Sequence, residues 1–421
     1  MKIKSISWML MGLLAVIMAV SCAGAPPAEE PPPPPPPSTP AAPPATPPPA
    51  PPVTPPPAPP PPQGLDALSP EELAQLYEET ENQLVTARQA AIESGAGIYA
   101  PDFLLDADNT VALALQKYDA NDKNGAKASA DEALLMYTAL KNGLDAYNLR
   151  EDFAWRIEEL APEYLWQADD VALEMFDKWR AKDYVGAKAA ADRALSVYQT
   201  IDNGLSAYDA RQSVVWTLQE LAPEYLWQAD DVALAALDKW EAGDFDGAGE
   251  GADKALLMYG TLKTAVDAWR LREEIASDAV NMDPIAFWRT DETGLAAIDK
   301  WDAGDFDGAK ADAETALLGY TVSGAVVERQ KALDARADVA VRLEFDVAQA
   351  LYDRAGQAYR RQDYSEAVRL YSESLYLFRQ AARTADNRRQ SAEEALRRAA
   401  QRLLESNETA RNADAILEGG R

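Results

Sequence analysis

Tryptophans and carboxylates recur together along this chain, and a site that binds or cleaves a glycan uses both residue types. The repeated set is Trp166, Trp227, Trp288, Asp169, Asp170, Asp230 and Asp231. Two adjacent acids on a helix point about 100° apart, so they do not both face one glycosidic bond. We therefore expect no hydrolysis and place the Asp pairs on a solvated helix face. Glycan binding by exposed tryptophans stays open.

A second candidate site is the stretch Asp305-Phe306-Asp307-Gly308 with Glu314, which matches part of a calcium-binding loop. The first ligand position of that loop holds Ala303, and the preceding copy holds Ala242 there. Without the first acid, calcium binding is disfavoured. We predict instead that Asp305 is the N-cap of a long helix, and that Asp244 is its counterpart in the preceding copy.

Composition excludes several function classes. The 421 residues carry a formal charge of −29, contain no histidine and contain one cysteine. This negative charge repels nucleic acids. The absence of histidine removes the usual neutral-pH base and the commonest zinc ligand. We expect a protein that is not an enzyme, with no cofactor, no metal and no nucleic-acid partner.

The N-terminus has the order of an export signal. Lys2 and Lys4 precede a thirteen-residue apolar stretch from Trp8 to Val20, which is too short to span a bilayer. The following residues, Ala-Val-Ser-Cys22, resemble the lipobox of bacterial lipoproteins. The resemblance implies that Cys22 is acylated and anchors the chain to the outer membrane. An ordinary cleaved signal with an incidental cysteine is the alternative.

The segment after Cys22 is a tether. Residues 26–62 hold 24 of the 29 prolines, so they lack the donors that helices and sheets need. In the polyproline II form these residues extend to roughly 115 Å, at about 3.1 Å per residue. We predict a semi-rigid spacer between membrane and folded part. A ligand for a proline-recognising domain is the alternative.

Four units of 61 residues follow the tether. Three sets of residues keep this interval throughout: Pro101, Pro162, Pro223 and Pro284; Tyr118, Trp179, Trp240 and Trp301; Tyr137, Tyr198, Tyr259 and Tyr320. The fourteen residues LAPEYLWQADDVAL occur identically at 160–173 and 221–234. A fixed period of this length is typical of repeat architectures.

Each unit has helical periodicity. Leu165, Ala168, Ala172, Met175 and Trp179 form one stripe of a short helix that begins at Pro162. A second stripe, from Tyr184 to Tyr208, predicts a long helix of about 36 residues after a turn at residues 181–183. Gly143 and Gly204 are not kept in later units, so we expect them not to interrupt it. The sustained seven-residue spacing predicts coiled-coil-like packing.

The turn resembles the middle of a tetratricopeptide repeat. Asp183-Tyr184-Val185-Gly186-Ala187 carries the likeness, and a divergent fifth unit repeats it around Asp363-Tyr364 and Tyr371. A broader resemblance, carried by Tyr99-Ala100-Pro101, is to a family of unknown function in bacterial envelope lipoproteins. It implies an envelope-associated helical module and no catalytic residues.

The C-terminal part differs in charge. Residues 351–421 hold 13 arginines, no lysine and 11 acids, which leaves −31 for the rest. Arg397, Arg398 and Arg402 cluster on a helix predicted from Ser391 to about Asn407. This helix is either the polar cap of a repeat array or a docking helix for an acidic partner.

These features predict an all-α chain of tandem helical hairpins forming an elongated solenoid. The predicted parts are a signal peptide (1–21), the lipidated cysteine and tether (22–64), an N-terminal helix (65–98), four repeats (99–336), and a fifth unit with the Arg-rich helix (337–421). We expect an outer-membrane lipoprotein that acts as a scaffold for envelope proteins, in the periplasm or on the cell surface. The alternative is a periplasmic glycan- or solute-binding protein. The oligomeric state stays open.

Overall fold

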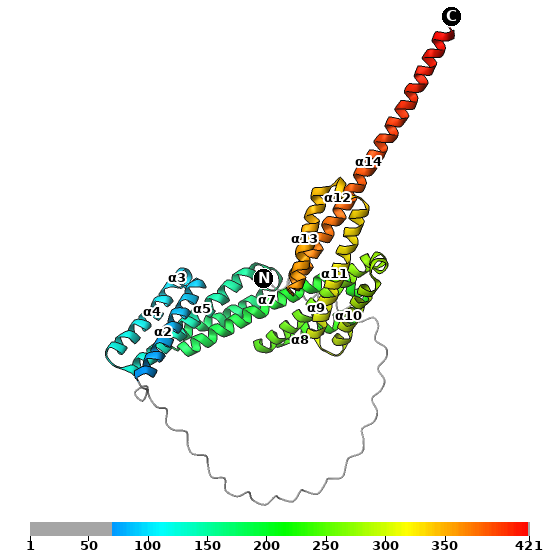
Figure 1. Cartoon of the computed structure of the whole chain (residues 1–421). Helices are drawn as coiled ribbons and strands as arrows, with labels where there is room; N and C mark the ends of the chain where they lie inside the picture. Colours follow the sequence, from blue (N-terminus) through cyan, green and yellow to red (C-terminus); the bar gives the residue numbers. More distant parts are fainter. Residues whose placement is uncertain (1–69, 420–421) are drawn as a thin grey trace, which may run out of the picture. The chain divides into compact units, whose positions relative to one another are not determined.

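A computed structural model describes residues 70–419, and every element in this range is a helix (Figure 1). The predicted signal peptide, Cys22 and the proline-rich tether lie outside the described residues. The helices are α2 (Pro70–Glu93), α3 (Ala96–Tyr99), α4 (Pro101–Asp119), α5 (Lys123–Leu160), α6 (Pro162–Arg180), α7 (Tyr184–Leu221), α8 (Pro223–Glu241), α9 (Phe245–Met282), α10 (Pro284–Asp302), α11 (Phe306–Asp334), α12 (Ala337–Ala340), α13 (Arg342–Arg360) and α14 (Tyr364–Gly419). The predicted all-α class is confirmed.

Proline and aspartate set the helix boundaries. Pro162 is the first residue of α6, and Ala161 before it is forced out of the helical region, at φ −159°. Asp183 caps α7 by accepting a hydrogen bond from the backbone N of Gly186 at 2.9 Å. The cap does not require glycine at this position, because Asp283 accepts the equivalent bond from the backbone N of Ala286 at 3.0 Å. The same cap recurs at Asp305, as predicted.

The helices pack in the order in which they occur in the sequence. The long helices α5, α7, α9, α11 and α14 each pack against the next one, and each short helix packs on the long helix that follows it. The core is divided accordingly. One cluster of buried residues joins the end of α7, α8 and α9 with Trp301 and Ala309 of the next unit. The predicted array of tandem hairpins, in which each unit contacts its neighbours, is confirmed.

The long helices are continuous through the glycines, as predicted. The helices α5, α7 and α9 are each 38 residues long. In α7 the predicted stripe from Ala187 to Leu205 is buried, but its last member, Tyr208, is 43% exposed. Tyr208 therefore lies off the buried face, which continues toward the end of α7 through Ala207, Val214 and Leu218.

The two ends of the array depart from the regular unit. The helix α11 is only 29 residues long, and a left-handed residue, Arg336, separates it from α12. Gly95 makes the same break between α2 and α3. Residues 391–407 are helical, as predicted, but they belong to α14, which runs unbroken for 56 residues past α12 and α13 (Figure 1). No glycine or proline occurs between Tyr364 and Asn407 to end it.

Candidate binding surface

The buried tryptophans join consecutive units. Trp240, at the end of α8, is 5% exposed and packs edge-on against Tyr164 of α6, with 5.7 Å between ring centroids. Its indole Nε1 donates a hydrogen bond to Gln167 of α6 at 2.6 Å. Trp301 makes the same bond to Gln228 at 2.7 Å. Each buried tryptophan therefore closes the interface with the preceding hairpin.

An arginine, an aspartate and a tyrosine form a second repeated contact. Arg150 of α5 donates two hydrogen bonds to Asp169 of α6, at 2.7 and 2.9 Å. The Tyr198 hydroxyl of α7 donates to the same carboxylate at 2.7 Å. The set recurs as Arg88–Asp108–Tyr137, Arg211–Asp230–Tyr259 and Arg272–Asp291–Tyr320. This triad ties one short helix to two long helices.

The triad perturbs the protonation of its members. Burial opposes ionisation of Asp169, but the hydrogen bonds from Arg150 and Tyr198 outweigh it and hold the pKa of Asp169 below its ordinary value. Burial, reinforced by the bond to Asp169, raises the pKa of Tyr198 far above its usual range. Asp169 is therefore a charged structural group at neutral pH.

The prediction that both acids of each pair face solvent is wrong for Asp169 and Asp230. Their carboxylates turn toward the long helices and are half-buried, whereas Asp170 and Asp231 are exposed. The sequence did contain a signal for this, because an arginine precedes each inward aspartate by 19 residues and keeps the 61-residue interval. These arginines are Arg150, Arg211 and Arg272. The prediction of a solvated face rested on the tryptophans and acids and left the arginines out.

The other repeated tryptophans face outward. Trp166, Trp227 and Trp288 are 62%, 52% and 57% exposed. Asp170 stands one helical turn after Trp166, and Asp231 one turn after Trp227. Each of these two tryptophans therefore shares a helix face with an exposed carboxylate. The duplicated segment thus supplies inward contacts through Gln167 and Asp169, and an outward pair through Trp166 and Asp170.

An apolar groove of about 570 Å³ lies between the start of α8 and α10, and residues of α9, α11 and the end of α7 also line it. Four exposed apolar side chains line it: Leu221 at the end of α7, Trp269 of α9, and Leu295 and Ile298 of α10. Tyr225 and Trp301 also line it, and the polar lining includes Arg272, Asp291 and Tyr320. A volume of this size is in the range of small-ligand and side-chain pockets.

Small side chains open this groove. In the hairpin of α6, Met175 fills the equivalent space, and its sulfur lies so near Gly143 that a Cβ there would be 2.6 Å away. Later units hold Ala236 and Ala297 at the place of Met175, and Gly294 replaces Ala233. A Cβ at Gly294 would meet Ala316 and the Tyr320 hydroxyl only at ordinary contact distances.

The arginines predicted for docking lie apart from the groove. Arg397, Arg398 and Arg402 are on the exposed last part of α14, where Arg398 pairs with Glu394 at 2.9 Å. The structure does not bring them together with Trp166 or Asp169. Among the described residues, no group of three potential metal ligands occurs.

Comparisons with known proteins add no family. No protein-family model, no curated protein and no solved structure matches this chain. The resemblances to envelope lipoproteins and tetratricopeptide repeats therefore stand on the quoted residues alone. No helix between residues 70 and 419 is long and apolar enough to cross a membrane.

Proposed function

We propose that this chain is a non-catalytic scaffold of the bacterial cell envelope. Acylated Cys22 anchors it to the outer membrane, the proline-rich segment is its spacer, and the helical array binds a partner protein. The observation that carries the binding role is the groove between α8 and α10, where Leu221, Trp269, Leu295 and Ile298 are exposed together. Apolar patches of this kind are typical of interaction sites.

The shape and charge of the groove suggest the partner's chemistry. A groove between two helices fits an amphipathic segment that inserts apolar anchors. Residues 1–350 carry a balance of −31, so basic residues flanking those anchors would speed association and favour this partner over acidic ones. Repetition supports the same role, since Leu160, Tyr208, Leu234 and Leu237 stand at the equivalent places one unit earlier.

Photo-crosslinking in living cells tests the groove. Benzoylphenylalanine at Leu295 should give one discrete protein adduct, and the same group at Trp216, which is 81% exposed and outside the groove, should not. Gly294→Phe should abolish the adduct by filling the groove, whereas Gly294→Ala should keep it. Equal labelling from both positions, or no adduct at residue 295, would contradict the proposed site.

The anchor is tested separately. Radioactive palmitate should label the wild-type chain and leave Cys22→Ser unlabelled, because Cys22 is the only cysteine in the sequence. Several acyl chains at this residue would hold the protein firmly on a membrane, at about 0.8 kcal/mol for each buried CH₂. Equal label in both chains would exclude Cys22 as the anchor.

The second candidate function is glycan binding, which the outward Trp166–Asp170 and Trp227–Asp231 pairs favour. Exposed aromatic rings beside carboxylates can stack on a sugar and accept hydrogen bonds from its hydroxyls. A glycan array separates the two functions. Saccharide binding that disappears in the Trp166→Ala, Trp227→Ala double variant would favour this candidate over a protein scaffold.

A further inference from the structure

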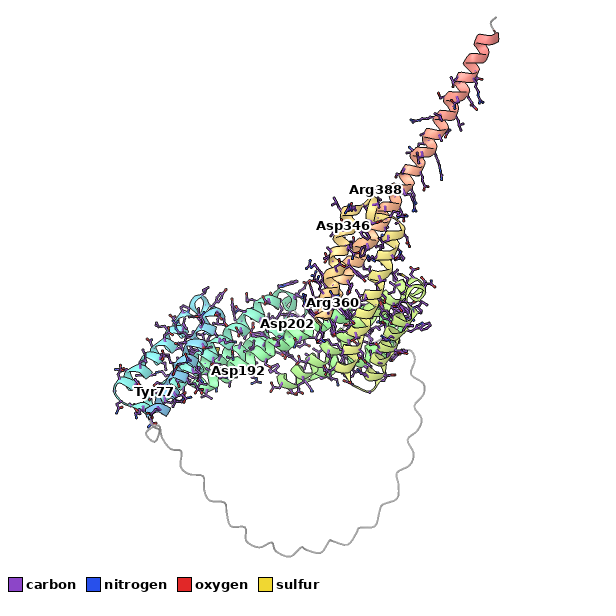
Figure 2. All side chains as sticks on the ribbon, viewed as in Figure 1. Tyr77, Asp192, Asp202, Asp346, Arg360 and Arg388 are labelled. Atoms are coloured by element: carbon purple, nitrogen blue, oxygen red, sulfur yellow. The ribbon has the colours of Figure 1, made fainter. Side chains whose placement is uncertain are left out.

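The last part of α14 is a long helix without a packed face in the described chain. Its buried positions end at Ala385, and every residue from Asn387 to Asn412 is exposed. Arg388, which donates a hydrogen bond to the backbone O of Ala340, lies where α14 leaves the other helices (Figure 2). Helices in proteins are stabilised mainly by packing an apolar face, so we expect another segment to pack against this part of α14.

That partner is not another hairpin of the array. In α7, the residues that receive the next hairpin are buried, and they are Ala207, Val214, Val215 and Leu218. Counted from the first residue of each helix, the same places on α14 hold Asn387, Glu394, Ala395 and Arg398. Charged side chains there would be desolvated without partners. The array therefore ends at α14.

A different stripe on α14 is apolar. Phe378 and Ala385, seven residues apart, are buried in the cluster that α14 forms with α11, α12 and α13. Ala392 and Ala399 continue that interval beyond the cluster, and Leu396 and Leu403 alternate with them. The position between Ala382 and Leu396 holds Arg389, which pairs with Asp386 at 2.9 Å and interrupts the stripe where α14 leaves the cluster. Spacings of four and three sustained in this way are the pattern of a coiled-coil seam. Beyond Arg389 the apolar stripe of α14 therefore resumes at Ala392, and it is uncovered.

We propose that the same stripe of a second copy of this chain covers it, so that two α14 helices form a coiled coil. Leucines that alternate with alanines let two helices approach closely, with large side chains set against small ones. The distribution of charge also favours association of two copies through this part of α14. Residues 387–412 hold six arginines and four acids, whereas residues 1–350 carry −31, so two copies repel each other least here.

The composition of the helix argues against a membrane surface as the occupant. Interfacial helices place large aromatic or aliphatic residues on one face and Lys or Arg on the other. Here the apolar face is half alanine, residues 387–412 contain no aromatic residue, and Glu393, Glu394, Glu405 and Glu408 lie among the arginines. These acids would be repelled by anionic headgroups.

Disulfide trapping tests the seam in the full chain carrying Cys22→Ser, where an added cysteine is the only one. Ala399→Cys should form linked dimers under mild oxidation. Gln401→Cys is the matched control, because it is exposed on the same helix about 200° around the axis. We expect at least about tenfold more dimer from the first variant. Equal yields from both variants would overturn the proposal.

Sedimentation gives an independent measurement. The Cys22→Ser chain should have twice the monomer mass, and Leu396→Asp with Leu403→Asp should weaken the dimer by about 100-fold or more, since two carboxylates would enter the seam. Leu404→Asp, beside the seam, should have a much smaller effect. A monomer at all concentrations, or a monomer that binds anionic vesicles through Leu396 and Leu403, would overturn the proposal. Neither result bears on the groove between α8 and α10.

Discussion

Trp240→Ala should lower the free energy of unfolding by about 3 to 5 kcal/mol. The indole is 5% exposed, packs against Tyr164 and Phe245, and donates a hydrogen bond to Gln167. Truncation removes this contact area and the hydrogen bond to Gln167, and it leaves a cavity between two hairpins. Urea denaturation followed by circular dichroism measures the loss.

The control for this substitution is Trp216→Ala. Trp216 has the same side chain on the neighbouring long helix but is 81% exposed, so its removal should change stability by less than about 0.5 kcal/mol. Equal losses in the two variants would mean that Trp240 is not buried between units.

Asp230→Ala should cost about 2 to 4 kcal/mol. Removing the carboxylate leaves the Arg211 guanidinium, whose side chain is 15% exposed, without its ion pair, and it also leaves the Tyr259 hydroxyl without an acceptor. A charge stranded in this way destabilises a protein more than the intact pair stabilises it. Thermal or chemical denaturation compared with Asp231→Ala, its exposed neighbour, gives the difference. A loss no larger than that of the neighbour would show that the triad is not structural.

The fifth unit supplies a second comparison for the triad. There Arg329 donates to Gln349 at 2.6 Å, and Phe378 stands where the other units have tyrosine. Gln349, an amide in place of the aspartate, thus occurs together with Phe378, whose ring has no hydroxyl that needs an acceptor. Asp230→Gln combined with Tyr259→Phe should therefore cost less than the sum of the two single changes, because the residues share one hydrogen-bond network.

Much of the array could be predicted because its signals are local. Pro162 must begin a helix or a turn, Asp183 has the side chain of an N-cap, and Trp179 and Trp240 complete helical stripes, so each was placed correctly. Each of these local signals recurs every 61 residues, which strengthens the prediction for every unit. The ends were harder, because the breaks at Gly95 and Arg336 occur once each and have no counterpart in the 61-residue period.

The candidate site was harder to predict because it depends on contacts between units. Periodicity alone does not distinguish Asp169 from Asp170, and only the approach of Arg150 and Tyr198 from two other helices turns one of them inward. The groove also depends on which side chains meet from neighbouring helices. It opens where Ala297 and Gly294 stand in place of larger side chains, and the sequence does not show which space those side chains would have filled.

Hydrogen exchange on Trp240→Ala and Trp301→Ala tests most directly whether each unit is stabilised by its neighbours. In an array with nearest-neighbour contacts, disrupting one interface weakens amide protection near that interface and progressively less with distance. Trp240→Ala should deprotect α6, α8 and the start of α9, and Trp301→Ala should deprotect α8, α10 and the start of α11. Two distinct patches are the predicted result. The same loss of protection across all units in both variants would mean that the units share one cooperative core. That result would contradict the claim that each unit is stabilised by its neighbours.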